Sequence, residues 1–266
     1  MSFKLTILGA GSSAGTPVVG CNCKTCLSNN PKNKRTRCSS IIQLSNGNNI
    51  LIDTSPDLRI QSLRENIDAV DAVLFTHHHA DHCHGIDDLR AFCQKNKKQI
   101  PLYGSDYVIR QLKDKFGYAM IDPQGFWEIP VLKPHIVENP FDLFGQTVTP
   151  IPVYHGRSMI YGYRIGNLAY LTDVSQIPDN SMKLLEGVET LLITCLRYKP
   201  HHTHFNYDQS LEAADKIRAR QTYLIHMTHE IEYDDLQNKL PEGIYAGYDG
   251  LKLTINYLII FGKQYD

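Results

Sequence analysis

The feature that most constrains this chain is the run Thr-His-His-His-Ala-Asp-His at residues 76–82, which directly follows an apolar segment. The apolar residues 69–75 predict a buried strand, so we expect the histidines in the loop where that strand ends. Side chains of an extended segment alternate in direction, so His77 and His79 point to one side and His78 to the other. This pattern predicts a metal ion held by His77 and His79. The alternatives are solvated loop histidines or the remnant of a tag, but a tag would lie at a terminus.

A second partial ligand set follows the first, because Asp81 and His82 offer a carboxylate and an imidazole after a turn. Two partial sets predict two divalent ions. Neither set is complete, since a catalytic ion usually has three or more protein ligands and an open position. Three downstream residues each follow an apolar run and are candidates for the missing ligands: His155, Asp173 and His226. Any one of them alone is better explained as a turn residue or a satisfied histidine, and only the three together favour metal binding.

Composition and charge exclude some partners. The chain has 266 residues, 42% of them hydrophobic and 21% charged, and we expect a single domain over residues 1–266. The formal net charge is -1, so no overall field attracts nucleic acid or an anionic membrane surface. The first apolar stretch is too short for a signal peptide, and no run approaches the roughly 20 residues that cross a bilayer. We therefore expect a cytoplasmic protein that does not contact membranes.

The order of apolar and turn-forming segments predicts an α+β fold. An Asn-Gly turn at residues 45–48 favours a hairpin, since Asn-Gly readily adopts positive φ. Strands are expected on either side of this turn and in the second half of the chain, with helices between them. Such a mixture favours two packed sheets covered by helices. The predicted strands are 3–8, 40–44, 49–53, 69–75, 146–154, 158–165, 168–171, 190–194 and 222–225, and the predicted helices are 56–66 and 207–220.

Cysteine usage favours metal or redox chemistry. The chain has seven cysteines, an odd number, and Cys21, Cys23 and Cys26 lie close together after a glycine-rich loop at residues 9–17. A framework of paired disulfides explains this spacing poorly. Three buried or redox-active thiols are the alternative to a metal site. The other four cysteines are expected to be ordinary thiols.

Together these residues resemble the metallo-β-lactamase superfamily. The carriers of the resemblance are the His-x-His-x-Asp-His run, the lone His155, Asp173 after a strand and the late His226. Members of that superfamily fold as a four-layer αββα sandwich with the site at one edge of the two sheets. The match is closer to the PhnP-like phosphodiesterases, which hydrolyse phosphoribosyl cyclic phosphates and share an early Cys-x-Cys-x-x-Cys loop. The resemblance implies these ligand sets: His77, His79 and His155 for one ion, Asp81, His82 and His226 for the other, and Asp173 as the bridge.

The resemblance also implies a structural zinc ion held by Cys21, Cys23, Cys26 and His229. Three thiolates and one imidazole form a closed tetrahedral site that stabilises a loop without catalysis. Thiolates select zinc, whereas the His and Asp ligands of the two catalytic ions accept zinc or manganese.

Catalytic roles are expected for Asp81, as a ligand of the reactive centre, and for His204. A leaving alkoxide needs a proton, and the resemblance implies His204 as its donor, with His201 as the second choice. Asp53 either orients a histidine ligand or caps a strand end. His84 is expected to line the pocket.

We therefore expect a hydrolase that uses two metal ions to cleave a small, cyclic phosphodiester such as a phosphoribosyl cyclic phosphate. Hydrolysis of a thioester or lactone, processing of tRNA 3′ ends and a non-catalytic metal-binding role are the alternatives. The basic run at residues 32–37 favours RNA, whereas the balanced overall charge argues against it. The expected partner is a small-molecule substrate, and the sequence leaves a homodimer open.

Overall fold

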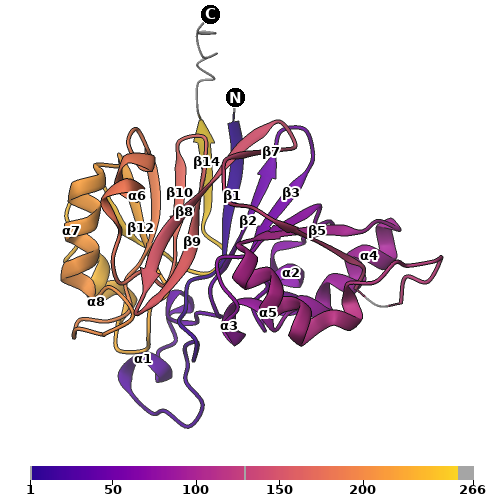
Figure 1. The fold of residues 1–266 in the computed structure, drawn as a ribbon. Helices are drawn as coiled ribbons and strands as arrows, with labels where there is room; N and C mark the ends of the chain where they lie inside the picture. Colours follow the sequence, from indigo (N-terminus) through magenta and orange to yellow (C-terminus); the bar gives the residue numbers. More distant parts are fainter. Residues whose placement is uncertain (1, 129, 257–266) are drawn as a thin grey trace, which may run out of the picture.

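Two seven-stranded sheets pack face to face in the computed structural model, which describes residues 2–128 and 130–256 (Figure 1). The α+β sandwich expected from the sequence is thereby confirmed. The domain was expected to extend over residues 1–266, and its last ten residues, 257–266, lie outside the described part.

The central strands of the first sheet are buried on both faces. In β2 the neighbours Ile41 and Ile42 are both buried, and they belong to different hydrophobic clusters on opposite sides of the sheet. Strand β3 to strand β6 run parallel, and the remaining pairs are antiparallel. In spatial order the strands are β14 (Lys252–Asn256), β1 (Ser2–Gly9), β2 (Ser39–Leu44), β3 (Asn49–Ile52), β4 (Ala72–Leu74), β5 (Ile100–Gly104) and β6 (Leu132–Ile136).

The second sheet also combines parallel and antiparallel pairs. Strands β10 to β13 run parallel, while β7, β8, β9 and β10 pair antiparallel. Its order is β13 (Ile244–Ala246), β12 (Gln221–Ile225), β11 (Thr190–Thr194), β10 (Leu168–Leu171), β9 (Ser158–Ile165), β8 (Gln146–His155) and β7 (Phe141–Leu143).

Helices flank the two sheets on their outer sides and complete the layers (Figure 1). Side chains of α5, among them Val108 and Leu112, pack on the outer face of the first sheet, and α7 contributes Ala213 and Ile217 to the other large cluster. The helices are α1 (Lys24–Leu27), α2 (Leu58–Glu65), α3 (Ala80–Cys83), α4 (Arg90–Asn96), α5 (Asp106–Phe116), α6 (Asp179–Leu184), α7 (Tyr207–Ile217) and α8 (Tyr233–Gln237).

Most predicted strands coincide with observed ones, but several elements were predicted too long. The helix expected at residues 56–66 is Leu58–Glu65. The strand expected at residues 69–75 is only Ala72–Leu74. The helix expected at 207–220 ends at Ile217, because Arg218 adopts a left-handed backbone with φ 58°. Apolar residues continue beyond the observed ends of this strand and of this helix, so the apolar pattern could not show where either element ends.

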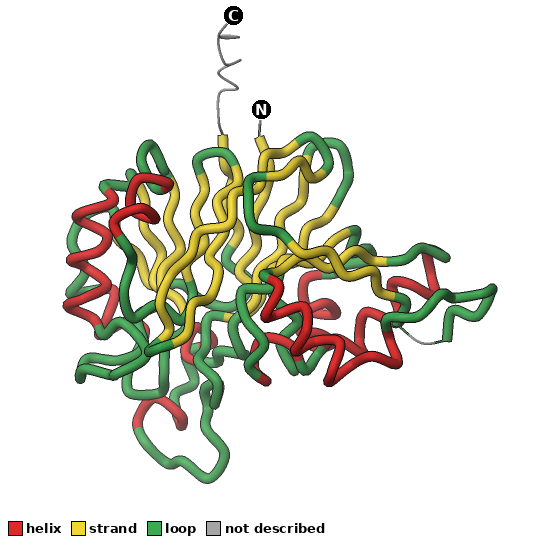
Figure 2. The backbone as a smooth tube through the Cα atoms, in the orientation of Figure 1, coloured by secondary structure: helices red, strands yellow, loops and turns green. Residues whose placement is uncertain are grey.

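Loops gather at the edge of the sandwich where α3 lies, which is the lower edge in Figure 2. This edge receives the carboxyl ends of the parallel strands in both sheets, so polar side chains from distant parts of the chain can meet there. Within the described residues, none of the helices is long and apolar enough to cross a membrane.

Candidate metal centre and active site

Five strands deliver polar side chains to this edge. Asp53 follows β3, residues 76–82 follow β4, Asp173 follows β10 after one residue and His226 follows β12, while His155 ends β8. Asp53, Asp173 and His226 adopt left-handed backbones, with φ of 59°, 57° and 60°. Non-glycine residues rarely adopt this conformation, and it concentrates at functional sites.

The first predicted ligand set comes together. Donor atoms of His77, His79 and His155 lie within 4.8 Å of one another. The His79 ring centroid lies 4.6 Å from that of His77 and 5.1 Å from that of His155. His77 is buried and His79 is exposed, so the group opens to solvent on one side. His78 lies elsewhere, with its ring against Tyr107.

The second predicted set also comes together, with Asp173 between the two. Donor atoms of Asp81, His82, Asp173 and His226 lie within 4.8 Å of one another. Asp173 Oδ1 is 3.3 Å from Nε2 of both His82 and His226, and its Oδ2 is 3.8 Å from His77 Nε2. The Asp173 carboxylate therefore faces both groups, as a bridging ligand would.

The chemistry of these donors fits divalent ions. The Nε2 atoms of His77, His82 and His226 are buried and have no hydrogen-bond partner. Native proteins seldom leave buried polar atoms unpaired, and a coordinated cation accounts for all three. Burial alone would raise the pKa of Asp173, but the neighbouring His226 and His82 hold it well below its usual value. A charged carboxylate among imidazole nitrogens supports divalent metal binding.

Hydrogen bonds to their Nδ1 atoms orient the imidazole rings of His82 and His77. Asp53 is buried, and its Oδ2 accepts from His82 Nδ1 at 2.8 Å and from Thr76 Oγ1 at 2.7 Å. Since a carboxylate only accepts, the Nδ1 of His82 carries the proton and its Nε2 lone pair faces Asp173. Thr76 Oγ1 in turn lies 3.0 Å from His77 Nδ1. The contact of Asp53 with His82 favours the orienting role over the strand-cap role.

Of the three remaining candidates, one reaches the metal-ligand groups. His204 Nε2 lies 3.0 Å from Asp173 Oδ2, whereas His201 lies behind it, with its Nδ1 3.3 Å from His204 Nδ1. Burial lowers the pKa of His204, and the hydrogen bond with Asp173 opposes that effect. The structure does not bring His84 to either group. This residue follows α3 on an exposed face, and its ring contacts Phe116 instead.

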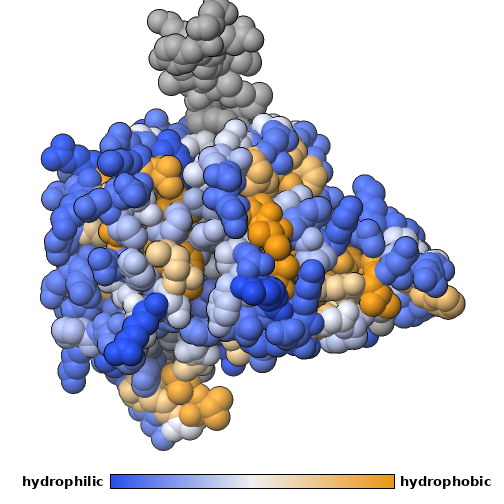
Figure 3. Space-filling view, in the orientation of Figure 1, coloured by the Kyte–Doolittle hydropathy of each residue, from blue (hydrophilic) through white to orange (hydrophobic). Residues whose placement is uncertain are grey.

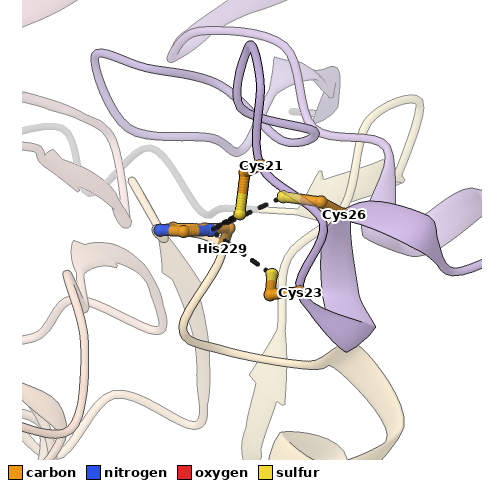
Figure 4. Close-up of side chains that lie close together, drawn as sticks. All are labelled: Cys21, Cys23, Cys26 and His229. Atoms are coloured by element: carbon orange, nitrogen blue, oxygen red, sulfur yellow. Dashed lines mark hydrogen bonds between the residues drawn. The ribbon is translucent and has the colours of Figure 1, made fainter.

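The cysteine loop forms a separate centre around His229. Its Nδ1 lies 3.2 Å from the Sγ of Cys21, 3.4 Å from that of Cys23 and 3.5 Å from that of Cys26, and Figure 4 shows the three sulfurs converging on it. The pKa of Cys23 is lowered to about 6, mainly by a hydrogen bond from the backbone N–H of Cys26. The side chains of Cys21, Cys26 and His229 lower it further, while burial opposes the shift. All four residues that the resemblance implied for this site therefore meet.

The segment that carries these cysteines projects from the sandwich and has little core of its own. It holds the short helix α1 (Figure 1). Apolar residues gather on its surface (Figure 3), and Val19 is 99% and Leu27 64% exposed. Its base is tied to the loop after β12, where Arg35 donates to the carbonyl oxygens of Thr228 and Ile231. A metal ion at the cysteines would anchor the rest of the segment to the same loop.

Sequence reasoning missed two hydroxyl residues, Thr76 and Thr203. Thr76 lies between Asp53 and His77, and the Thr203 carbonyl oxygen accepts from His155 Nδ1 at 2.9 Å. The only sequence signal was their position directly before a candidate histidine.

With this geometry in hand, comparison with known proteins defines the class. Residues 48–227 match the family model of the beta-lactamase superfamily domain. A diphosphatase from the PhnP family has a crystal structure that is 42% identical, with a TM-score of 0.89, and the match covers 96% of this chain and 98% of that one. The chain therefore belongs to the metallo-β-lactamase superfamily and, within it, is PhnP-like. Fold, clusters and relatives together support a metal-dependent hydrolase.

Two further relatives extend the comparison. An octanoyltransferase from Porphyromonas gingivalis is 38% identical over 258 residues, which cover 96% of this chain. The chain spans about half of that relative's length, 52%. Human tRNase Z, short form, is 15% identical with a TM-score of 0.68, and the match covers 94% of this chain and 98% of that one. At that identity the likeness shows the shared fold alone.

Proposed function

We propose that this protein hydrolyses a phosphoester or phosphoanhydride bond in a small molecule by dinuclear metal catalysis. The observation that carries the proposal is the placement of Asp173. Its carboxylate faces both ligand groups, and its Oδ2 also lies 3.0 Å from His204 Nε2. Two ion positions and a candidate proton donor thus share one residue.

Divalent ions at the two groups, when bound, supply Lewis-acid charge stabilisation and lower the pKa of a water molecule toward neutrality. The chain's own residues do the rest. Asp81 and Asp173 contribute the negative charge that would hold the ions, and Asp53 keeps the His82 Nε2 lone pair free to bind one of them. His204 Nε2 holds the proton that the leaving oxygen needs. Exposed His79 marks the side from which substrate enters.

Two substrate classes follow from the relatives. The resemblance to phosphoribosyl cyclic phosphodiesterases favours a cyclic phosphodiester, and the 42% identical diphosphatase favours a diphosphate. Both substrates contain a phosphoryl group, whose charge ions held at the two ligand groups would stabilise, so the same residues would serve either reaction.

Contacts of the basic run at residues 32–37 support a small molecule over RNA. Arg35 is buried, with 1% of its surface exposed, and Arg37 forms an ion pair with Asp57 at 2.8 Å. Lys32 Nζ lies over the rings of Tyr233 and Tyr248. These cations are engaged within the protein, whereas phosphate-backbone binding needs free Lys and Arg side chains.

We also propose that Cys21, Cys23, Cys26 and His229 hold a structural zinc ion. The convergence of three sulfurs on His229 Nδ1 supports this proposal, as does the preference of thiolates for zinc.

A substrate panel tests the main proposal. The purified protein, supplied with Mn²⁺ or Zn²⁺, is assayed with bis(p-nitrophenyl) phosphate, a ribose cyclic phosphodiester, a dinucleoside diphosphate and an octanoyl thioester. The thioester is included because the Porphyromonas gingivalis relative is named for acyl transfer. The variant Asp173→Ala should lose at least about 100-fold in rate, because the charge that both ion positions share is gone. Asp179→Ala, at the exposed start of α6, is the matched control.

Turnover of a phosphorus substrate that depends on added metal and on Asp173 would support the proposal. Thioester hydrolysis without turnover of any of the phosphorus substrates would overturn it in favour of acyl chemistry.

A further inference from the structure

A short loop, residues 197–205, lies against the metal-ligand groups and is fixed at both ends. The guanidinium of Arg197 donates back to the carbonyl oxygens of Lys199 and Pro200. At the other end, the backbone N–H of Phe205 donates to Val174 O, which lies directly after Asp173. Side chains in the middle of the loop are therefore held at a defined position relative to Asp173.

Within this loop, Thr203 contacts three histidines of the site. Its carbonyl oxygen accepts from His155 Nδ1 at 2.9 Å. Its hydroxyl oxygen lies 2.8 Å from His204 Nδ1 and 3.0 Å from His201 Nδ1. Its backbone N–H also donates to His201 Nδ1, at 3.3 Å. Because that nitrogen accepts, the Thr203 hydroxyl donates to His201 and is left to accept from His204 Nδ1–H.

Packing fixes the direction of the Thr203 side chain. Its methyl group lies against Gly156, where an added Cβ would approach Thr203 Cγ2 to 2.8 Å. Gly156 adopts φ 60° in the turn between β8 and β9, and its N–H donates to Ser175 Oγ at 2.9 Å. A β-branched side chain has few χ1 choices. With the methyl against Gly156, the hydroxyl is directed at His204.

We infer that Thr203 is a positioning residue, whose hydroxyl holds the His204 ring so that Nε2 faces Asp173 and the leaving group of the substrate. Its carbonyl oxygen also keeps the Nδ1 of His155 protonated and leaves the Nε2 lone pair for an ion. The inference rests on the proposed role of His204 as proton donor. It adds a residue that recognises no part of the substrate and acts through the two histidines.

The test compares substrates that need a proton donor with substrates that do not. Thr203→Val removes the hydroxyl but keeps a methyl for the Gly156 contact and the carbonyl oxygen for His155. With a diester that has an alkyl leaving group, we expect kcat to fall about 10- to 100-fold, because a misplaced acid loses most of its effect. With a p-nitrophenolate leaving group, which needs little protonation, we expect a change of less than about 3-fold. Metal content should stay at the wild-type value.

Matched variants separate positioning from general damage. Thr203→Ser keeps the hydroxyl and should restore the rate with the alkyl leaving group to within about 3-fold. Thr203→Ala lacks the hydroxyl and adds no methyl near His204, so it should repeat the result of Thr203→Val even if the valine fits poorly. Thr147→Val, on an exposed position of β8, should leave both rates unchanged. Added to His204→Ala, the Thr203→Val change should cause no further loss, because both act through one ring.

Two failures can be told apart. If His204→Ala lowers the rates equally for both leaving groups, the proposed proton donor is wrong. If His204→Ala shows the leaving-group dependence while Thr203→Val and Thr203→Ala do not, His204 is the donor and the positioning role of Thr203 is refuted.

Discussion

Replacing Asp53 with asparagine should weaken the second metal-ligand group without touching an ion directly. The Asp53 carboxylate accepts three hydrogen bonds, from Thr76 N at 2.8 Å, Thr76 Oγ1 at 2.7 Å and His82 Nδ1 at 2.8 Å. Asparagine has one oxygen and one NH₂ group, so at least one of these donors would face another donor. The simplest adjustment moves the His82 proton from Nδ1 to Nε2, which removes the lone pair directed at Asp173.

The expected loss of metal affinity follows from the role of residues that hydrogen-bond to a metal ligand. Loss of one typically lowers metal affinity or activity about 10- to 100-fold. This range corresponds to about 1.4–2.7 kcal/mol in binding free energy. Asp53 is fully buried, so solvent cannot replace the lost acceptor, and we expect the upper half of the range.

Metal titration against a chelating indicator measures the effect on affinity, with circular dichroism to confirm the fold. Asp57→Asn is the matched control, because Asp57 also accepts from a neighbouring residue, Arg37, but contacts neither ligand group. Wild-type affinity and stoichiometry in a folded Asp53→Asn protein would refute the orienting role of Asp53.

Two further changes test other parts of the structure. Cys23→Ser should remove about one of about three bound ions per chain and lower the melting temperature, because the projecting segment has little core. Unchanged zinc content per chain, measured by elemental analysis, would contradict the cysteine site. In β9, Gly162→Ala would force a Cβ against the Leu171 side chain and should cost about 1–3 kcal/mol of unfolding free energy. Gly117→Ala is the control, because a Cβ added there meets nothing within 4 Å. Its free energy of unfolding, measured by denaturant titration, should stay within about 1 kcal/mol of the wild-type value. Equal losses of unfolding free energy at both glycines would show that the predicted clash is absent.

Local sequence patterns were sufficient for much of the scaffold. The strands predicted at 158–165, 168–171 and 190–194 match β9, β10 and β11, because runs of buried apolar residues between turn-forming residues report strand positions directly. Helix α5 was not predicted, although Ser105 accepts from Val108 N as an N-cap and the helix buries one face. Its signal lay in a capping residue and a 3.6-residue apolar period, both weaker than the apolar runs that mark the strands.

The residue types of the site were also readable from the sequence, since imidazoles, carboxylates and thiolates at such spacing have few other uses. Which of these residues meet in space was harder to predict from the sequence. Cys21 and His229 are 208 positions apart, and only the packing of the projecting segment against the loop after β12 brings them together. The resemblance implied this pairing, but spacing alone did not.

What the sequence determined by itself was the set of candidate metal-binding side chains and the strands that carry them, because both depend on residue type and short-range order. Tertiary structure decided which of these side chains meet. It placed His204 rather than His201 against Asp173, left His84 against Phe116, and put Thr76 and Thr203 behind the ligand histidines. Hydrogen bonds of this kind depend on distances between loops that follow different strands of a sheet, and no local pattern along the chain records those distances.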